Sequence, residues 1–262
     1  MKRLAVFWLG AWVLAALAAP GFLYQAAMHI QVSQALEAPS FSHWFGTDAL
    51  GRDLFLRVVC GSSVSLGIGV GAVALATLVG SWVGAIAGYF GGWREKGVLA
   101  LISLFLCFPA FFLILAVMAV VGGSAWNILW ILALTGWMGV ARLVRAQAMS
   151  LREREFVLAA RALGAGDFRI LSRHILPNAM GPVRASAVLG VSSAILAEAG
   201  LSFLGIGVQP PVPSWGNLLL DGKAVLGVGW WMMFFPGVVI FLTVFFLNVL
   251  GEELSRARRT AS

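Results

Sequence analysis

Ionisable side chains are rare in this chain, so their positions limit the chemistry it can perform. Of its 262 residues, 60% are hydrophobic and 11% are charged. One carboxylate, Glu198, falls inside the apolar run SSAILAEAGLSFLGIG. An acid at such a position could bind a proton supplied by an ion gradient. The alternative is a structural acid that accepts hydrogen bonds from a neighbouring helix, and the sequence favours this second interpretation.

Motifs for catalysis and metal binding are absent from the sequence. It contains no G-x-x-x-x-G-K-[ST], no H-E-x-x-H, no G-x-S-x-G and no cysteine cluster. The two cysteines, Cys60 and Cys107, lie far apart in or beside apolar runs, so we expect two unpaired thiols. We therefore predict a non-catalytic chain that binds no cofactor. Its energy must come from a gradient or from a separate ATP-hydrolysing partner.

A charged segment, EREFVLAARALGAGDFRILSRHILPN (153–178), interrupts the apolar sequence with four arginines. Phe156, Ala160 and Leu163 recur at helical spacing and predict a helix with one apolar stripe. Gly164 follows as a typical helix end. Such a helix could form part of a protruding knob, or it could lie on the membrane surface beneath anionic headgroups.

The second half of this segment predicts another short helix. Gly166 continues the break, and Asp167 is placed to cap the helix FRILSRHIL. That helix is expected to end at Pro177, before the next apolar run.

Long apolar runs predict an all-α membrane protein with six transmembrane helices. The mean hydropathy is +0.93, and about 20 apolar residues are needed to cross a bilayer core of roughly 30 Å. The predicted spans are Leu4–Leu23, Ser63–Tyr89, Val98–Val121, Ile128–Val144, Pro182–Leu204 and Val228–Gly251. This gives a first helix in 1–24, an extracytoplasmic segment with a short helix in 25–62, and a five-helix core in 63–262 with a cytoplasmic loop at about 146–181.

The basic residues predict the orientation of these spans. If the N-terminus is cytoplasmic, 15 of the 18 lysines and arginines fall on the cytoplasmic side. Only Arg52, Arg57 and Lys223 fall outside. Both termini and the charged segment are therefore expected in the cytoplasm, and the net charge of +7 needs no nucleic-acid partner. The first span also has the features of a cleavable signal peptide, although its length favours retention.

Small residues recur every four positions in the second span and predict close helix packing. They are Ala72, Ala76, Gly80, Gly84, Gly88 and Gly92. Small side chains let helix backbones approach in lipid. The partner helix could belong to this chain or to another subunit.

The charged segment resembles the cytoplasmic signature of ABC-importer permease subunits. That signature is E-A-A, three residues, G, nine residues and I-x-L-P; Ala159, Ala160, Gly164, Leu176 and Pro177 match it in register. Leu158 replaces the glutamate and His174 replaces the isoleucine. In that family the loop carries a coupling helix that sits in a groove of the ATPase subunit. The resemblance implies this coupling role for Glu155, Phe156, Leu158, Ala159, Ala160, Arg161, Leu163, Gly164, Ala165, Asp167, Arg169, Leu176 and Pro177.

Two further segments resemble the second permease subunit of dipeptide, oligopeptide and nickel importers. They are FSHWFGTDALGRDLFLRVVCGSSVSL and AEAGLSFLGIGVQPPVPSWGNLL. The first forms an outer-mouth motif comprising Gly46, Thr47, Asp48, Gly51, Arg52 and Asp53. Thr47 or Asp48 could cap a short helix, and Asp53 is spaced to pair with Arg57. The second segment predicts a proline-stiffened outer loop with Trp215 at the membrane interface.

The resemblance implies a set of partners and a location. The partners are a homologous permease subunit, two ATP-binding subunits that hold ATP and Mg²⁺, an extracytoplasmic substrate-binding protein and the lipid bilayer. The location is the inner membrane of a bacterium. The cargo is expected to be a peptide, with nickel or a metal chelate as the alternative within this branch. A gradient-driven carrier that uses Glu198 is the alternative from another class.

Overall fold

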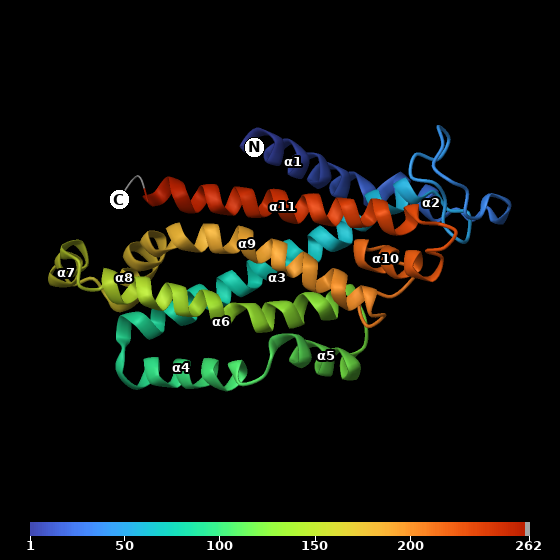
Figure 1. The fold of residues 1–262 in the computed structure, drawn as a ribbon. Helices are drawn as coiled ribbons and strands as arrows, with labels where there is room; N and C mark the ends of the chain where they lie inside the picture. Colours follow the sequence, from blue (N-terminus) through green and yellow to red (C-terminus); the bar gives the residue numbers. More distant parts are fainter. Residues whose placement is uncertain (260–262) are drawn as a thin grey trace.

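The computed structural model describes residues 1–259 and shows an elongated bundle of helices (Figure 1). Within these residues the only β-type pairing is an isolated bridge between Thr47 and Asp53. The elements are α1 (Lys2–Ala18), a π-helical turn (Ala19–Leu23), α2 (Tyr24–Met28), a 3₁₀ turn (Val32–Gln34), α3 (Leu54–Phe90), α4 (Gly92–Leu106), α5 (Ala110–Val121), α6 (Ala125–Leu151), α7 (Glu155–Ala162), α8 (Asp167–Ile170), a second π-helical turn (Leu171–Ile175), α9 (Leu176–Phe203), α10 (Trp215–Ala224) and α11 (Trp231–Arg259). The all-α prediction is confirmed.

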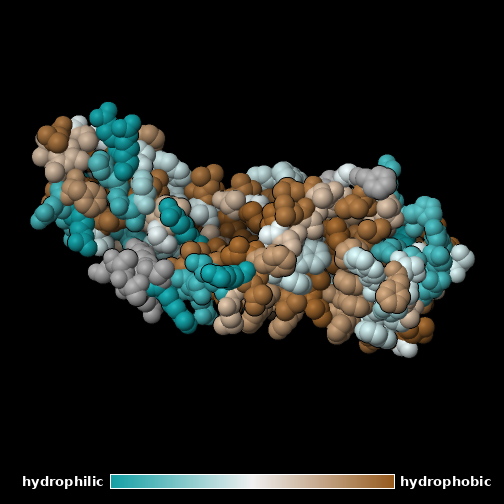
Figure 2. Space-filling view, turned by 90° about the horizontal axis from the view of Figure 1, so that it is seen from above, coloured by the Kyte–Doolittle hydropathy of each residue, from teal (hydrophilic) through white to brown (hydrophobic). Residues whose placement is uncertain are grey.

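Four described helices, in α3, α6, α8–α9 and α11, are long and apolar enough to cross a membrane. On the face shown in Figure 2, hydrophobic residues dominate the middle of the molecule and hydrophilic residues gather toward its two ends. The predicted first span begins as α1, which has 17 residues, and continues into the π-helical turn, which is kinked at Gly21. The count of six spans and the orientation of the termini remain predictions.

The predicted span Val98–Val121 is a broken pair of helices. α4 and α5 meet at a bend of 78° and together could form a fifth span. Pro109 stands at the break as the residue before α5. Proline disfavours helical backbone at the residue before it and supplies no N–H of its own, so a continuous helix is interrupted here.

The small-residue stripe of α3 packs against α6 of the same chain. A Cβ atom on Gly80 would lie 2.5 Å from the carbonyl oxygen of Trp137, and Gly84 and Gly88 also abut the α6 backbone. The two helices lie side by side in Figure 1. The sequence left open whether the partner helix belongs to this chain or to another subunit, and the structure shows a partner helix in this chain.

Two helix boundaries differ from the sequence prediction. The helix after Asp167 does not end at Pro177, because α8, the π-helical turn and α9 run on as one helix from Asp167 to Phe203. Pro177 is the second residue after the π-helical turn Leu171–Ile175, where the regular hydrogen-bond pattern of the continuous helix is already interrupted. Likewise α3 begins at Leu54, nine residues before the predicted span, and includes the short helix expected in the outer segment.

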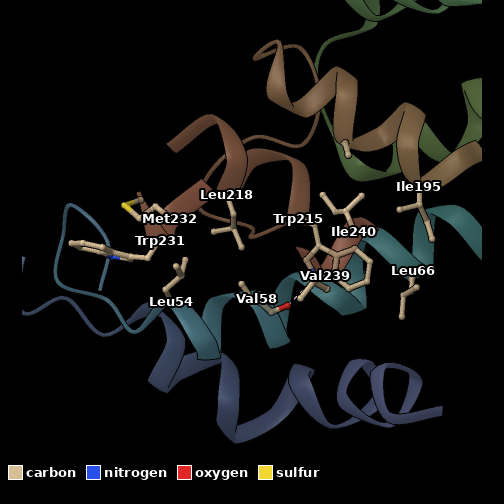
Figure 3. Packing of buried hydrophobic residues seen from close by; sticks show 11 residues of the cluster. Leu54, Val58, Leu66, Ile195, Trp215, Leu218, Trp231, Met232, Val239 and Ile240 are labelled. Carbon is tan, nitrogen blue, oxygen red and sulfur yellow. Dashed lines mark hydrogen bonds between the residues drawn. The ribbon is translucent and has the colours of Figure 1, made fainter. Parts of the chain in front are cut away.

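The predicted outer loop contains a helix, α10. Ser214 and Asn217 form a reciprocal capping box at its start. Trp215 is fully buried between helices instead of lying at the membrane interface. Its indole nitrogen donates to the carbonyl oxygen of Val58 at 3.0 Å, which ties α10 to α3 (Figure 3). The interface position predicted for Trp215 is therefore wrong, because the indole fills the core and has its own hydrogen-bond partner.

Candidate functional site

The candidate residues lie in three separate places. Helices α7 and α8, which we call the knob (residues 155–170), project from one end of the bundle, and the outer-mouth motif lies at the opposite end near α10 (Figure 1). Glu198 is inside the bundle, in the part of α9 that packs against α3 and α10. The structure therefore does not gather them into one catalytic centre.

The first knob helix ends in a glycine turn, as the sequence predicts. Gly164 has φ of +81°. Its N–H bonds to the carbonyl of Arg161, and the N–H of Ala165 bonds to the carbonyl of Ala160, both at 3.0 Å. This is the Schellman arrangement, which needs a left-handed residue at this position. A Cβ on Gly164 would meet no atom within 4 Å, so the backbone conformation alone favours glycine.

The side of α7 that packs inward differs from the predicted stripe. Val157 is fully buried in a cluster with Ile170 and Leu171. The expected stripe residues Phe156 and Leu163 are exposed, Leu163 by 89%. The eight-residue helix packs by one side chain of its first turn, because α8 and the following π-helical turn fill the adjoining space. An apolar surface is thus left open on the knob.

Further exposed knob residues extend this open surface. Leu158, which replaces the family glutamate, is 49% exposed, and Phe168 is 73% exposed. The solvent-exposed Arg169 of the knob, and Arg173 in the π-helical turn that follows it, make no ion pair within residues 1–259. The knob therefore presents apolar side chains and cationic groups together. Exposed apolar side chains gathered in this way mark a candidate contact surface for another molecule.

Tyr89, at the end of α3, joins the two knob helices. Arg161 Nη2 donates to Tyr89 Oη at 3.0 Å, and Tyr89 Oη donates to Asp167 Oδ1 at 2.6 Å. The guanidinium carbon of Arg161 lies 5.5 Å from the centroid of the tyrosine ring. We call this three-residue arrangement the tyrosine clasp. The hydrogen bond to Tyr89 raises the pKa of Arg161 above its ordinary value.

The tyrosine clasp corrects one sequence prediction. Asp167 does not act as an N-cap, because Gly166 holds that position and the Asp167 carboxylate accepts from Tyr89. One donor of Arg161 is used within the chain, in its hydrogen bond to Tyr89. Sequence reasoning missed Tyr89, and the available signal was weak: it is one of two tyrosines, near the end of a small-residue helix.

Glu198 accepts hydrogen bonds from two buried serines. Ser65 Oγ on α3 donates to Oε2 and Ser202 Oγ donates to Oε1, both at 2.8 Å. Ser65 Oγ also accepts from the N–H of Trp215 at 3.1 Å, and Ser202 Oγ accepts from the N–H of Val208 at 3.0 Å. The carboxylate thereby connects α3, α9 and the start of α10. This geometry matches the structural interpretation of Glu198.

The outer-mouth motif is organised around Asp48. Its carboxylate accepts from Arg52 Nε at 2.6 Å and from Arg57 Nη1 at 2.7 Å, and Arg57 Nη1 also reaches Asp221 Oδ2 on α10 at 3.1 Å. The predicted pair of Asp53 with Arg57 is not formed. Asp53 is instead the N-cap of α3.

Other members of the motif shape the surrounding loop. The Asp53 carboxylate accepts from the N–H of Leu56 and bonds to His43 Nδ1 at 2.8 Å, which replaces the cap predicted at Thr47 or Asp48. The Thr47 hydroxyl bonds to the backbone of Gln34 and Glu37. Gly46 and Gly51 have φ of +75° and +72°, and each abuts another backbone segment.

Comparisons with known proteins converge on one family. The model of the family "binding-protein-dependent transport system inner membrane component" matches residues 76–260. The dipeptide transport system permease protein DppC of Alkalihalophilus pseudofirmus is 40% identical over 94% of this chain and 81% of its own length. The oligopeptide transport system permease protein OppC of Bacillus subtilis is 38% identical over 94% of this chain and 80% of its own length.

A solved structure shows the same fold. A chain of the methionine ABC transporter MetNI, in an inward-facing conformation, aligns with 78% of this chain and 95% of its own length. The TM-score is 0.60 and the sequence identity is 18%. The resemblance to ABC-importer permeases in the sequence is therefore supported by the fold.

Proposed function

Given that this chain belongs to the family of binding-protein-dependent transport system inner membrane components, we propose that it is one of two paired permease subunits of an ABC importer for peptides. The relatives named as dipeptide and oligopeptide permeases support the cargo class. The observation that carries the proposal is the knob. It combines a matched signature, an open apolar and cationic surface, and hydrogen bonds that connect it to α3.

In the proposed mechanism, an extracytoplasmic binding protein delivers the peptide to a pathway between this chain and a homologous permease. Two partner subunits bind ATP and Mg²⁺, and a groove on one of them receives the knob. Closure of these subunits moves the knob and rocks the helices between inward-open and outward-open states. This chain hydrolyses nothing. The knob and both termini face the cytoplasm, and residues 25–53 and α10 face outward in the inner membrane of a bacterium.

The proposal is tested by changing the exposed knob surface without touching the core. Leu163→Glu is expected to keep the chain in the membrane but lower co-purification of the ATPase subunits at least tenfold. Peptide uptake into proteoliposomes should fall equally. The matched control is Leu226→Glu, which changes a leucine that is 55% exposed at the opposite end of the molecule. Normal ATPase binding and uptake in Leu163→Glu would contradict the assignment of the knob.

Charge reversal provides a second test of the same surface. Arg169→Glu should uncouple ATP hydrolysis from uptake, because the exposed guanidinium is proposed to meet an acidic groove.

The cargo is tested separately, by identifying the ligand that co-purifies with the cognate binding protein. A nickel complex in place of a peptide would favour the alternative within this branch. The gradient-driven carrier is not favoured, because both carboxylate oxygens of Glu198 accept hydrogen bonds from serines.

A further inference from the structure

A pair of adjoining hollows lies alongside α3. The first, about 300 Å³, lies between α3, α5, α6 and α9, and alanine and glycine residues make up much of its wall, among them Ala72, Ala76, Gly136, Gly139, Gly190 and Ala194. The second, about 290 Å³, lies between α3 and the beginning of α9. Thr77 lines both. We call the two together the α3 hollow.

Two hydroxyls in the wall of the α3 hollow have no hydrogen-bond partner. Thr77 Oγ1 and Ser81 Oγ are both buried and unbonded within residues 1–259, and Ser81 is only 5% exposed. They are one helical turn apart on α3, so they follow one another along the same face. Burying a hydroxyl without a partner is unfavourable, and native proteins rarely leave one so.

Two other hydroxyls of the same wall show the usual arrangement. Thr135 Oγ1 donates to the carbonyl of Ile131 at 3.0 Å, and Ser193 Oγ donates to the carbonyl of Leu189 at 3.2 Å. Each is satisfied within its own helix. Thr77 and Ser81 differ from them because neither hydroxyl has a hydrogen-bond partner among the described residues, so each would gain one if a polar group entered the hollow.

We propose that the α3 hollow is the wall of the peptide pathway on this subunit, where Thr77 and Ser81 hydrogen-bond to the main-chain amides of the passing peptide. This inference rests on the proposed function. Main-chain groups are common to all peptides, and a wall of alanine and glycine leaves room for different side chains. The site would therefore bind peptides with little regard to sequence.

The position of the α3 hollow connects it to the knob. Trp82, Leu176 and Met180 line its second part. The ring of Trp82 stacks on that of Phe168 in α8, with centroids 5.9 Å apart and an angle of 11° between the planes. A displacement of the knob would therefore alter the lining of the α3 hollow at this end.

Cysteine labelling of the whole reconstituted transporter tests the proposal. In a Cys107→Ser background, which removes the exposed native thiol, Thr77→Cys and Ser81→Cys are treated with a charged, membrane-impermeant methanethiosulfonate. The control is Val79→Cys, because Val79 is 47% exposed and lines neither part of the α3 hollow. Labelling at 77 and 81 should be at least tenfold faster than at 79, since the reactive thiolate requires water. Saturating peptide with binding protein and ATP should slow it several-fold.

The outcomes separate this inference from the proposed function. Slow labelling at 77 and 81 in a transporter that still takes up peptide would overturn the inference alone, as would fast labelling that peptide does not slow. If the chain without any substitution does not associate with ATPase subunits, that result would instead contradict the proposed function. In uptake assays, Thr77→Val should raise KM for peptide three- to tenfold, and Thr77→Ser, which keeps the hydroxyl, should restore it. An unchanged KM in Thr77→Val would also overturn the inference.

Discussion

The two ends of the molecule hold their charged residues in opposite ways. At the end that holds the outer-mouth motif, which we call the outer end after that motif, Asp48 is 1% exposed and Arg57 is 4% exposed, and both are joined by ion pairs to a neighbouring element. At the knob, the arginines lie on the surface, and the tyrosine clasp is the main polar connection to the bundle. Buried, multiply bonded charges hold a structure in one conformation, whereas exposed charges on a short helix remain available to a partner.

This difference indicates how the proposed transporter divides its tasks. The outer end connects residues 46–57, α10 and α3 through buried polar contacts, so we expect it to move as one body. The knob contributes Val157 and the tyrosine clasp to its attachment. Substitutions at the outer end should therefore reduce stability, and substitutions at the knob should reduce coupling. The following experiments test that division, from the largest expected effect to the smallest.

Removing Arg57 should have the largest effect. Arg57→Leu leaves the buried Asp48 with only Arg52 as a cationic partner and removes the connection to Asp221. Breaking one side of a buried ion pair costs about 3 kcal/mol. We expect lower yield and a clearly lower unfolding temperature of the detergent-solubilised complex. Arg256→Leu, at an exposed position of α11, is the control. Equal stability of the two variants would show that the outer end is not the rigid region.

Glu198→Ala should destabilise the protein by about 2 kcal/mol, because it leaves the hydroxyls of Ser65 and Ser202 without their buried acceptor. Glu198→Gln keeps one acceptor oxygen and should retain most stability and uptake. The measurements are thermal unfolding and peptide uptake for both variants. A stable Glu198→Gln protein that has lost uptake would instead indicate a proton-binding role for this acid.

Tyr89→Phe should lower the free energy of local unfolding of the knob by about 1 kcal/mol. Arg161 and Asp167 lose the shared hydroxyl, but both can still bond to water. Amide hydrogen exchange in α7 and α8 should become several-fold faster. The unfolding temperature should hardly change. ATP hydrolysis per peptide transported should rise. Tyr24→Phe, at the other tyrosine of the chain, is the matched control. Unchanged exchange in the knob would show that the clasp does not hold it.

Leu158→Glu should have the smallest effect on stability, within about 0.5 kcal/mol, because this side chain is half exposed. It restores the acid of the family signature and introduces a negative charge on the cationic knob. If the partner groove is acidic, the affinity for the ATPase subunits should fall, and a titration of these subunits measures it. Tighter association would show that the groove itself carries a positive group at this point.

The sequence allowed parts of this architecture to be predicted, because apolar length and glycine turns are local signals. The main helices and the break at Gly164 follow from such signals. The bend at Pro109 and the capping box of Ser214 and Asn217 were also local, but the surrounding apolar run and the neighbouring prolines obscured them. The pairing of Arg57 with Asp221 could not be predicted, since the two residues are 164 positions apart and Asp53 offered a closer partner.

The continuity of α8, the π-helical turn and α9 has a mechanical consequence. From Asp167 to Phe203 these residues form one helix of 37 residues, about 55 Å long at 1.5 Å per residue. Its first turn carries Phe168 of the knob, and its last turn carries Ser202, which bonds to Glu198. No loop separates the two, so a displacement of the knob is expected to tilt this helix or to bend it at the π-helical turn Leu171–Ile175 or at Pro182, which lies inside α9. A tilt would reach the hydrogen bonds of Glu198 near the far end of the helix.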